Sequence, residues 1–276
     1  MTILETIAAQ KRLAVAARRE LVPLKMLEAS LYFETAPLSL RHYLTRSGSS
    51  GLIAEFKRRS PSQGWLNRYA PVERTTVGYM QAGAAALSIL TDEPFFGGQA
   101  ADLALARRYN YCPVLRKDFV VDDYQIVEAK SLGADAILLI AALLSPAEIA
   151  RFGRLARSLG LEVLLEVHSA AELHRAAPTA EAVDLIGVNN RNLHDFSVSL
   201  DTSLVLADEI PAGFGRVTES GIGSAAALVA LRAAGYQGFL LGEAFMRHAR
   251  PERACAALLQ EVAAANTNAP ALAHVC

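Results

Sequence analysis

Cysteine is scarce in this sequence of 276 residues, which contains only Cys112, Cys255 and Cys276. The three cysteines lie far apart and form no C-x-x-C pair, so neither a disulfide framework nor a zinc site is expected, and no other metal site is predicted. The first residues lack the basic-then-apolar order of a secretory signal. Both absences favour a reducing compartment, and we expect a cytoplasmic protein.

The sequence also has no large excess of charge of one sign and no long hydrophobic run. The formal net charge is -1, which argues against nucleic-acid binding through bulk electrostatics. No apolar run approaches the ~18 residues of a membrane span, so no membrane association is expected. Hydrophobic residues nevertheless make up 52% of the chain and charged residues 20%, so the sequence can bury a large core.

Short β-rich runs alternate with helical stretches over most of the sequence, at a repeat of ~20–35 residues that is typical of βα units. Several helical stretches begin with capping signals, as in the "SPAE" run from Ser145, and several end at glycine. The eight predicted strands are Leu52–Lys57, Ala85–Leu90, Pro113–Lys117, Asp135–Ile140, Leu161–Val167, Asp184–Asn189, Arg216–Glu219 and Gly238–Gly242.

Two folds are compatible with this alternation, a closed barrel and a doubly wound open sheet. An open sheet that binds a dinucleotide needs G-x-G-x-x-G after an early strand, and none follows Leu52–Lys57. Strand number and length therefore favour an α/β fold with a single (β/α)8 TIM barrel. We expect residues 1–48 to form a helical extension packed on the barrel, 49–266 to form the barrel, and 267–276 to be a flexible tail.

Five predicted strands place an apolar or small residue first and a polar residue last on one face. In a barrel, alternate residues point inward and the chemistry lies at the carboxyl ends of the strands. We therefore expect an apolar interior below a charged mouth, in which Lys117 can act as a general acid and Glu166 as a proton acceptor or donor. The five sets are Ile53, Glu55 and Lys57; Leu115 and Lys117; Leu164 and Glu166; Gly187 and Asn189; Val217 and Glu219.

Three loops have the composition of a phosphate site. The loops after the last two predicted strands read "ESGIGS" (219–224) and "LGEAFM" (241–246), and in this fold they usually hold phosphate through helix N-terminal N–H groups. The loop "KRRSPSQG" (57–64) adds serines and cations. One such glycine turn alone would more often only close a βα unit.

Seven segments, in order along the chain, resemble indole-3-glycerol phosphate synthases. The resemblance covers nearly the whole predicted barrel and implies a carboxy-lyase of tryptophan biosynthesis that needs no cofactor or metal. Its implied reaction converts 1-(2-carboxyphenylamino)-1-deoxyribulose 5-phosphate into indole-3-glycerol phosphate, CO2 and water. The segments are "AEFKRRSPSQG" (54–64), "PVLRKDFVVDDYQI" (113–126), "GADAILLIAALL" (133–144), "LLEVHS" (164–169), "IGVNNRNL" (186–193), "TESGI" (218–222) and "FLLGEAFM" (239–246).

The resemblance also implies roles for single residues. Lys117 is similar to the general acid of ring closure and Glu166 to its acid/base partner in dehydration, while Lys57 would meet the substrate carboxylate or the sugar hydroxyls. The other implied catalytic residues are Glu55, Asn189, Glu219 and Ser220. The implied phosphate ligands are Ser60, Arg191, Gly221, Gly242 and Glu243, the last through its backbone. The implied walls of the aromatic-ring pocket are Phe96, Phe119, Leu138 and Leu193.

Two positions depart from the family pattern. Gln63 stands where many relatives have lysine, which weakens phosphate attraction unless Arg58 and Arg59 compensate. Glu243 stands where some relatives have serine. Because its carboxylate would repel phosphate, we expect its side chain to turn away from the site.

Two alternative functions remain open at this point. Another phosphate-binding barrel enzyme, such as an isomerase of tryptophan or histidine biosynthesis, would share the glycine loops but not both "EFKRRSPS" and "LRKDF". A non-enzymatic sensor of a phosphorylated metabolite would not need Lys57, Lys117 and Glu166 together. His168 is expected in packing or solvent rather than in the site. We expect a small phosphorylated substrate and a monomer, with a partner enzyme left open.

Overall fold

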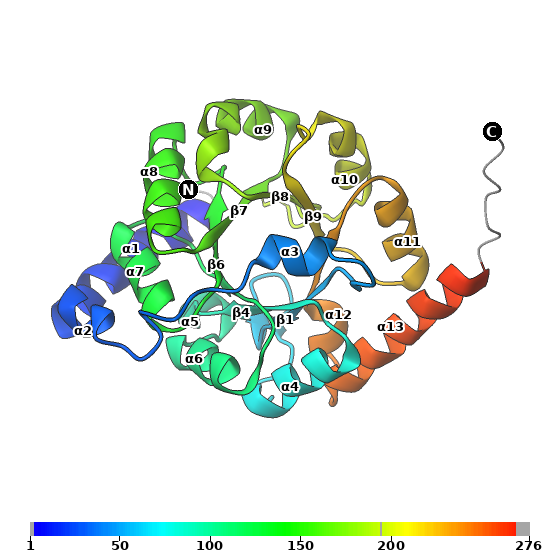
Figure 1. Ribbon diagram of the computed structural model, residues 1–276, viewed down its shortest axis with the longest axis horizontal. Coiled ribbons are helices and arrows are strands. Elements are labelled where there is room, and N and C mark those ends of the chain that lie inside the picture. Colours follow the sequence, from blue (N-terminus) through cyan, green and yellow to red (C-terminus); the bar gives the residue numbers. More distant parts are fainter. Residues whose placement is uncertain (1–2, 194, 269–276) are drawn as a thin grey trace.

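The computed structural model describes residues 3–193 and 195–268, and its centre is a closed barrel of parallel strands (Figure 1). The order around the barrel is β1-β10-β9-β8-β7-β6-β5-β4. The predicted (β/α)8 TIM barrel is confirmed, and each predicted strand agrees with the observed one to within one residue at either end. The barrel strands are β1 (Leu52–Phe56), β4 (Ala86–Leu90), β5 (Val114–Lys117), β6 (Ala136–Ile140), β7 (Glu162–Val167), β8 (Leu185–Asn189), β9 (Gly215–Glu219) and β10 (Gly238–Leu241).

Helices form the outer layer of the barrel (Figure 1). The capping signal at Ser145 works as predicted, because its hydroxyl accepts from the Glu148 N–H and the Glu148 carboxylate accepts from the Ser145 N–H. The long helices are α4 (Val72–Ala82), α6 (Ala100–Tyr109), α7 (Asp123–Ser131), α8 (Pro146–Ser158), α9 (Ala170–Ala176), α10 (Asp201–Leu206), α11 (Ala225–Ala233) and α13 (Pro251–Asn268). Short helical turns are α5 (Glu93–Phe96), α12 (Glu243–Met246), η1 (Ala177–Ala182) and η2 (Ala207–Glu209).

Two apolar layers follow from the alternation along each strand. Inward residues pack together inside the barrel, while their outward neighbours pack against the helices. The expected apolar interior is thus present below the mouth. The inner layer includes Ile53, Leu115, Leu138, Leu164, Val217 and Leu240. The outer layer includes Leu52, Phe56, Val114, Leu165 and Val188.

The N-terminal segment contacts both ends of the barrel. Helix α3 (Leu40–Thr45) lies across the near end in Figure 1, where Leu40 and Leu44 join the inner apolar layer. Helix α1 (Ile3–Leu21) lies at the opposite end, over the mouth, and α2 (Leu24–Glu28) packs on α7. The buried ammonium of Lys11 fixes α1, because it lies 2.7 Å from Asp92 and 2.8 Å from Asp118.

Two features lie outside the predicted elements. The loop after β1 contains an unpredicted two-stranded hairpin, β2 (Arg59–Ser60) with β3 (Gly64–Trp65). At the other end of the chain, α13 includes residues 267 and 268, which were expected in the tail. The remainder of that predicted tail, 269–276, lies outside the described residues. No helix in the described part of the chain is both long and apolar enough to cross a membrane.

Candidate active site

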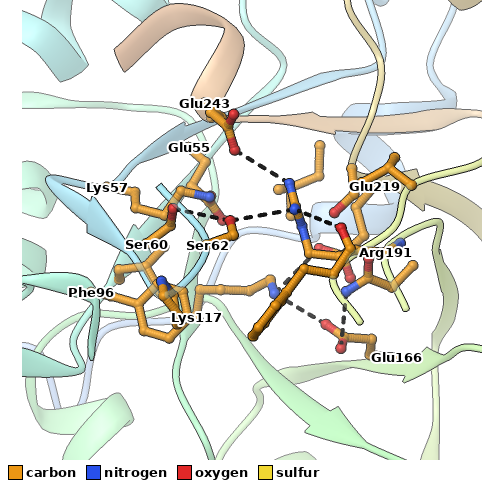
Figure 2. Close-up of a pocket in the computed structure, with 18 of the residues that line it drawn as sticks. Glu55, Lys57, Ser60, Ser62, Phe96, Lys117, Glu166, Arg191, Glu219 and Glu243 are labelled. Atoms are coloured by element: carbon orange, nitrogen blue, oxygen red, sulfur yellow. Dashed lines mark hydrogen bonds and ion pairs between the residues drawn. The ribbon is translucent and has the colours of Figure 1, made fainter. Parts of the chain in front are cut away.

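A pocket of about 460 Å³ lies at the carboxyl ends of the barrel strands (Figure 2). Every residue that the sequence predicted for the site lines this one pocket, whereas the roles given to them remain predictions. From the predicted catalytic set it is lined by Glu55, Lys57, Lys117, Glu166, Asn189, Glu219 and Ser220. From the predicted phosphate and ring sets it is lined by Ser60, Arg191, Gly221, Gly242, Glu243, Phe96, Phe119, Leu138 and Leu193.

Lys117, the last residue of β5, lies at the centre of the charged groups. Its Nζ is 3.1 Å from Oε2 of Glu166 on β7 and 3.2 Å from Oε2 of Glu219 on β9. Burial alone would lower the pKa of Lys117, but the charges of Glu166, Glu219 and Glu55 outweigh burial and raise the pKa above its ordinary value. Lys117 is therefore held as an ammonium group that can donate hydrogen bonds and a proton.

Glu166 and Glu219 share this lysine but differ in charge. Burial would raise the pKa of Glu166, yet the neighbouring charge of Lys117 lowers it to about 2. Burial and the charge of Glu166 together raise the pKa of Glu219 well above its ordinary value. The ionised form is therefore favoured at Glu166 and the protonated form at Glu219. Oε1 of Glu219 is buried without a hydrogen-bond partner among the described residues, so it is available to a substrate.

A second lysine comes from β1 and its following loop. Lys57 Nζ lies 2.7 Å from Oε1 of Glu55, and the Ser88 hydroxyl donates a hydrogen bond to the other oxygen, Oε2, at 3.4 Å. Gly242 permits this placement, because a Cβ there would lie 2.5 Å from Glu55 Oε1. No group of three or more His, Cys, Asp or Glu side chains in residues 3–193 and 195–268 is arranged to hold a metal ion.

The loop after β9 has a strained backbone. Ser220 and Gly221 have φ angles of 70° and 77°, and the left-handed region is unfavourable for a serine. Asn190, which the sequence analysis did not select, holds the loop by donating to the carbonyl oxygens of Glu219 at 3.0 Å and Ser220 at 3.1 Å. Its position beside Asn189 was the available signal, but it does not reveal that contact.

Arg191, one of the predicted phosphate ligands, is paired with a carboxylate in the pocket (Figure 2). Its Nη2 is 3.3 Å from Glu243 Oε2, and its Nη1 donates to Ser62 Oγ at 3.4 Å. Arg247 contacts the other Glu243 oxygen at 3.3 Å. The expectation that the Glu243 side chain turns away is wrong, because two guanidinium groups attract it into the site. Arg247 also lines the pocket and was missed by the sequence analysis.

Arg58 and Arg59 do not compensate for Gln63. Arg58 makes an ion pair with Asp102, with Nη2 donating to Oδ1 at 2.9 Å, and Arg59 donates to the Pro94 carbonyl at 2.9 Å. Neither arginine is among the residues that line the pocket. Arg58 is thus paired with α6 and Arg59 is bonded to α5, so neither supplies the compensation for Gln63 that the sequence analysis left open.

The apolar wall of the pocket combines predicted and unpredicted residues. The rings of Phe96 and Phe119 lie 5.8 Å apart, and together with Leu138 they border the pocket. Helix α1 adds Ile3, Leu4 and Ile7 to the lining. Nothing local in the sequence marks these three, because only the path of the extension across the mouth brings them there.

Comparison with known proteins identifies the family. The model of the family described as indole-3-glycerol phosphate synthase matches residues 4–258. The chain belongs to the indole-3-glycerol phosphate synthase family. The indole-3-glycerol phosphate synthase of Bacteroides thetaiotaomicron is 45% identical over 250 residues, covering 90% of this chain and 94% of the relative. That of Laribacter hongkongensis is 47% identical over 260 residues, covering 93% and 98%.

More distant solved structures agree with the barrel fold of this indole-3-glycerol phosphate synthase family member. A chain from the tryptophan synthase α2β2 complex of Pyrococcus furiosus has a TM-score of 0.56 at 15% identity, covering 78% of this chain and 99% of that one. The 3-hexulose-6-phosphate synthase of Salmonella typhimurium has a TM-score of 0.57 at 13% identity, covering 77% and 98%. At such identities the likeness concerns the fold alone.

Proposed function

We propose that the pocket binds 1-(2-carboxyphenylamino)-1-deoxyribulose 5-phosphate in one orientation. The phosphate lies by Arg191 and the loops after β9 and β10, and the aryl ring lies by Phe96 and Phe119. The support is the separation of charge in the pocket, with a guanidinium and glycine loops on one side and apolar side chains on the other.

The enzyme is an indole-3-glycerol phosphate synthase, a carboxy-lyase of tryptophan biosynthesis that acts on a phosphorylated small molecule. It closes the indole ring of its substrate with loss of CO2 and then of water. The proposal concerns which residues carry each step.

Ring closure is assigned to Lys117. Attack of the aryl carbon on the ketone places negative charge on the carbonyl oxygen, and a buried ammonium stabilises and protonates that oxygen. The observation that carries this assignment is the position of Lys117 Nζ, 3.1 Å from Glu166 and 3.2 Å from Glu219 at the base of the pocket. The two carboxyl groups fix the ammonium without filling the space above it.

Loss of CO2 needs little from the protein, because it restores the aromatic ring. Lys57 is assigned to orient the substrate carboxylate or the sugar hydroxyls, with Glu55 positioning its ammonium at 2.7 Å. The aromatic and α1 side chains exclude water from the reacting centre.

Dehydration needs one group that accepts a proton from carbon and one that protonates the departing hydroxyl. Glu166 is ionised and is assigned as the acceptor, and Asn189 orients it by donating to Oε1 at 3.3 Å. Glu219, whose pKa is raised by burial and by the charge of Glu166, is assigned as a proton donor near the same centre. Ser220 lines the pocket beside it.

The direct test is formation of indole-3-glycerol phosphate by the purified protein, followed by indole fluorescence. We expect turnover without added metal or cofactor. Turnover of phosphoribosylanthranilate without an indole product would favour an isomerase. Binding of the substrate without turnover would favour a metabolite sensor.

We further propose that the enzyme acts in the cytoplasm as a monomer, in which residues 1–48 form an extension packed on a barrel of residues 49–266. The thiols of Cys112 and Cys255 are free, which fits a reducing compartment. Sedimentation of the active protein tests the monomer, and a stable larger species at assay concentrations would contradict it. Limited proteolysis tests the division at residue 48.

A further inference from the structure

A second cleft lies beside the active-site pocket, with a cavity volume of about 860 Å³. It shares Leu4, Asn189, Arg191 and Leu193 with the active-site pocket, and its other side includes the exposed residues Glu5, Arg12 and Arg175. His168 lines this cleft but not the active-site pocket. The cleft therefore gives solvent a second approach to the residues behind the catalytic centre.

His168 contacts the catalytic carboxylate from the side of this cleft. Its Nε2 lies 3.4 Å from Glu166 Oε1, while Lys117 Nζ lies 3.1 Å from the other oxygen, Oε2. The Nε2 atom is buried and has no well-aligned hydrogen-bond partner among the described residues. Buried polar atoms without a hydrogen-bond partner are rare, and a role in proton transfer to Glu166 would explain this one.

The ring of His168 is held in a fixed orientation by α9. Ser169 accepts from the Glu172 N–H at 3.3 Å as the cap of α9, and Glu172 accepts from the His168 N–H at 2.8 Å. The same Glu172 oxygen lies 3.3 Å from His168 Nδ1. Because Glu172 lines the cleft and Nε2 faces Glu166, Nδ1 is the nitrogen through which a proton can enter the ring and Nε2 is the one through which it can leave.

The reaction consumes one proton from solvent in each turnover. The substrate carboxylate enters as an anion and leaves as neutral CO2, and its carbon–carbon electron pair restores the aromatic ring. The ketone oxygen leaves as water, having taken two protons, while the substrate carbon releases only one to a base. Lys117 and Glu219 each give one of these protons and Glu166 takes one back, so this set of groups ends a turnover one proton short unless solvent resupplies it.

We propose that His168 relays this proton from the second cleft to Glu166, which passes it to Lys117. Proton transfer runs from water in the cleft through the Glu172 carboxylate to Nδ1, from Nε2 to Glu166 Oε1, and from Glu166 Oε2 to Lys117 Nζ. The path stays open when substrate fills the active-site pocket. The inference rests on the proposed roles of Glu166 and Lys117, and makes His168 a positioning residue that acts through Glu166.

The charges around His168 keep it able to carry a proton. Burial lowers the pKa of His168, but its hydrogen bond to Glu172 and the charges of Glu166 and Glu172 outweigh burial and raise it. The charge of Lys117 opposes this effect. The charged groups that face His168 or line its cleft are Glu166 on β7, Glu172 and Arg175 on α9, Lys117 on β5, Glu5 and Arg12 on α1, and Arg191 after β8.

The test replaces His168 and follows proton transfer rather than activity alone. In His168→Gln, we expect the steady-state kcat to fall about 10-fold or more, with KM and the single-turnover rate changed less than about 3-fold, because Lys117 is protonated at the start of the first turnover. In His168→Ala, added imidazole should restore kcat in proportion to its protonated fraction. His174→Gln is the matched control, because His174 on α9 is exposed and pairs with Glu209 at 3.2 Å.

A second variant distinguishes the relay from a structural role. Glu172→Gln keeps His168 but removes a charge that raises its pKa, so the alkaline fall of kcat should move to lower pH. Wild-type rates and a wild-type pH profile in His168→Gln would overturn the relay. A second combination of results would also overturn it: a His168→Ala variant that is unfolded, or that is slow and not rescued by imidazole, together with an unshifted pH profile in Glu172→Gln. Loss of turnover in Glu166→Gln alongside such results would leave the proposed function intact.

Discussion

Lys117 and Glu166 lie on different strands, 49 residues apart in the sequence, yet Nζ of the lysine is 3.1 Å from Oε2 of the glutamate. The strand order brings them together, because β5 and β7 both pair with β6 and each carries an inward polar residue near its carboxyl end. Burial of an ammonium next to an ionised carboxylate favours the charged form of both. The two opposite charges are therefore in place before substrate binds.

Lys117→Ala should reduce kcat by ~100-fold or more, because the group that protonates the carbonyl oxygen is removed. The apparent affinity for inorganic phosphate, measured as a competitive inhibitor, should stay nearly unchanged, since Arg191 and the glycine loops remain. Lys25→Ala is the control, because Lys25 is exposed on α2. A near-normal kcat in Lys117→Ala would remove this lysine from its proposed role.

The pH dependence of kcat/KM should show an alkaline fall that depends on Glu219. Because burial and the charge of Glu166 raise the pKa of Glu219, its protonated form is favoured, and loss of that proton as the pH rises removes a donor. Glu166, with a pKa of about 2, stays ionised and adds no acidic fall above about pH 5. In Glu219→Gln, the alkaline fall assigned to Glu219 should disappear. An unchanged profile in that variant would show that another group is responsible.

Glu243→Gln should strengthen phosphate binding by a few-fold, because the carboxylate that now neutralises Arg191 and Arg247 would no longer compete with phosphate. Arg191→Gln should do the opposite and weaken binding about 10-fold or more. Inhibition constants for inorganic phosphate measure both effects. Weaker phosphate binding in Glu243→Gln would instead mean that Glu243 positions Arg191 for the ligand.

Lys11→Met should lower the free energy of unfolding by about 3 kcal/mol, because Asp92 would remain buried without this cation and Asp118 would keep only Arg116, 3.2 Å away. Arg19→Met on the same helix removes an exposed pair with Asp122 and should cost less than about 1 kcal/mol. Urea unfolding of both variants makes the comparison. Equal losses would contradict the dominant role given to the buried pair.

The barrel and most of the site could be predicted because strand alternation is a local signal. Leu164 and Glu166, two residues apart, predict an inward face that begins apolar and ends charged, and both lie where expected. Long-range placement gives no such signal. Ile3 lines the pocket only because α1 lies across the mouth of the barrel. Arg58, next to a loop hairpin that the sequence analysis missed, bonds to Asp102.

Glu243 shows a different limit of sequence reasoning. Repulsion from a future phosphate suggested that its side chain turns away, but in this structure two arginines face it. Arg247 lies one helical turn beyond Glu243, so its contact with Glu243 could be foreseen. Arg191 follows β8, far away in the sequence, so its contact could not. The net charge of a pocket depends on the side chains from every strand that borders it. The local sequence around one residue does not reveal those side chains.

A double-mutant cycle between Lys117 and Glu166 tests the central claim most directly. The single variants Lys117→Ala and Glu166→Gln and their combination are compared by the single-turnover rate of indole-3-glycerol phosphate formation. If the two residues act as one proton-transferring unit, the double variant should be about as slow as the slower single variant. Losses that simply multiply would mean that the two groups act independently, and would contradict the account.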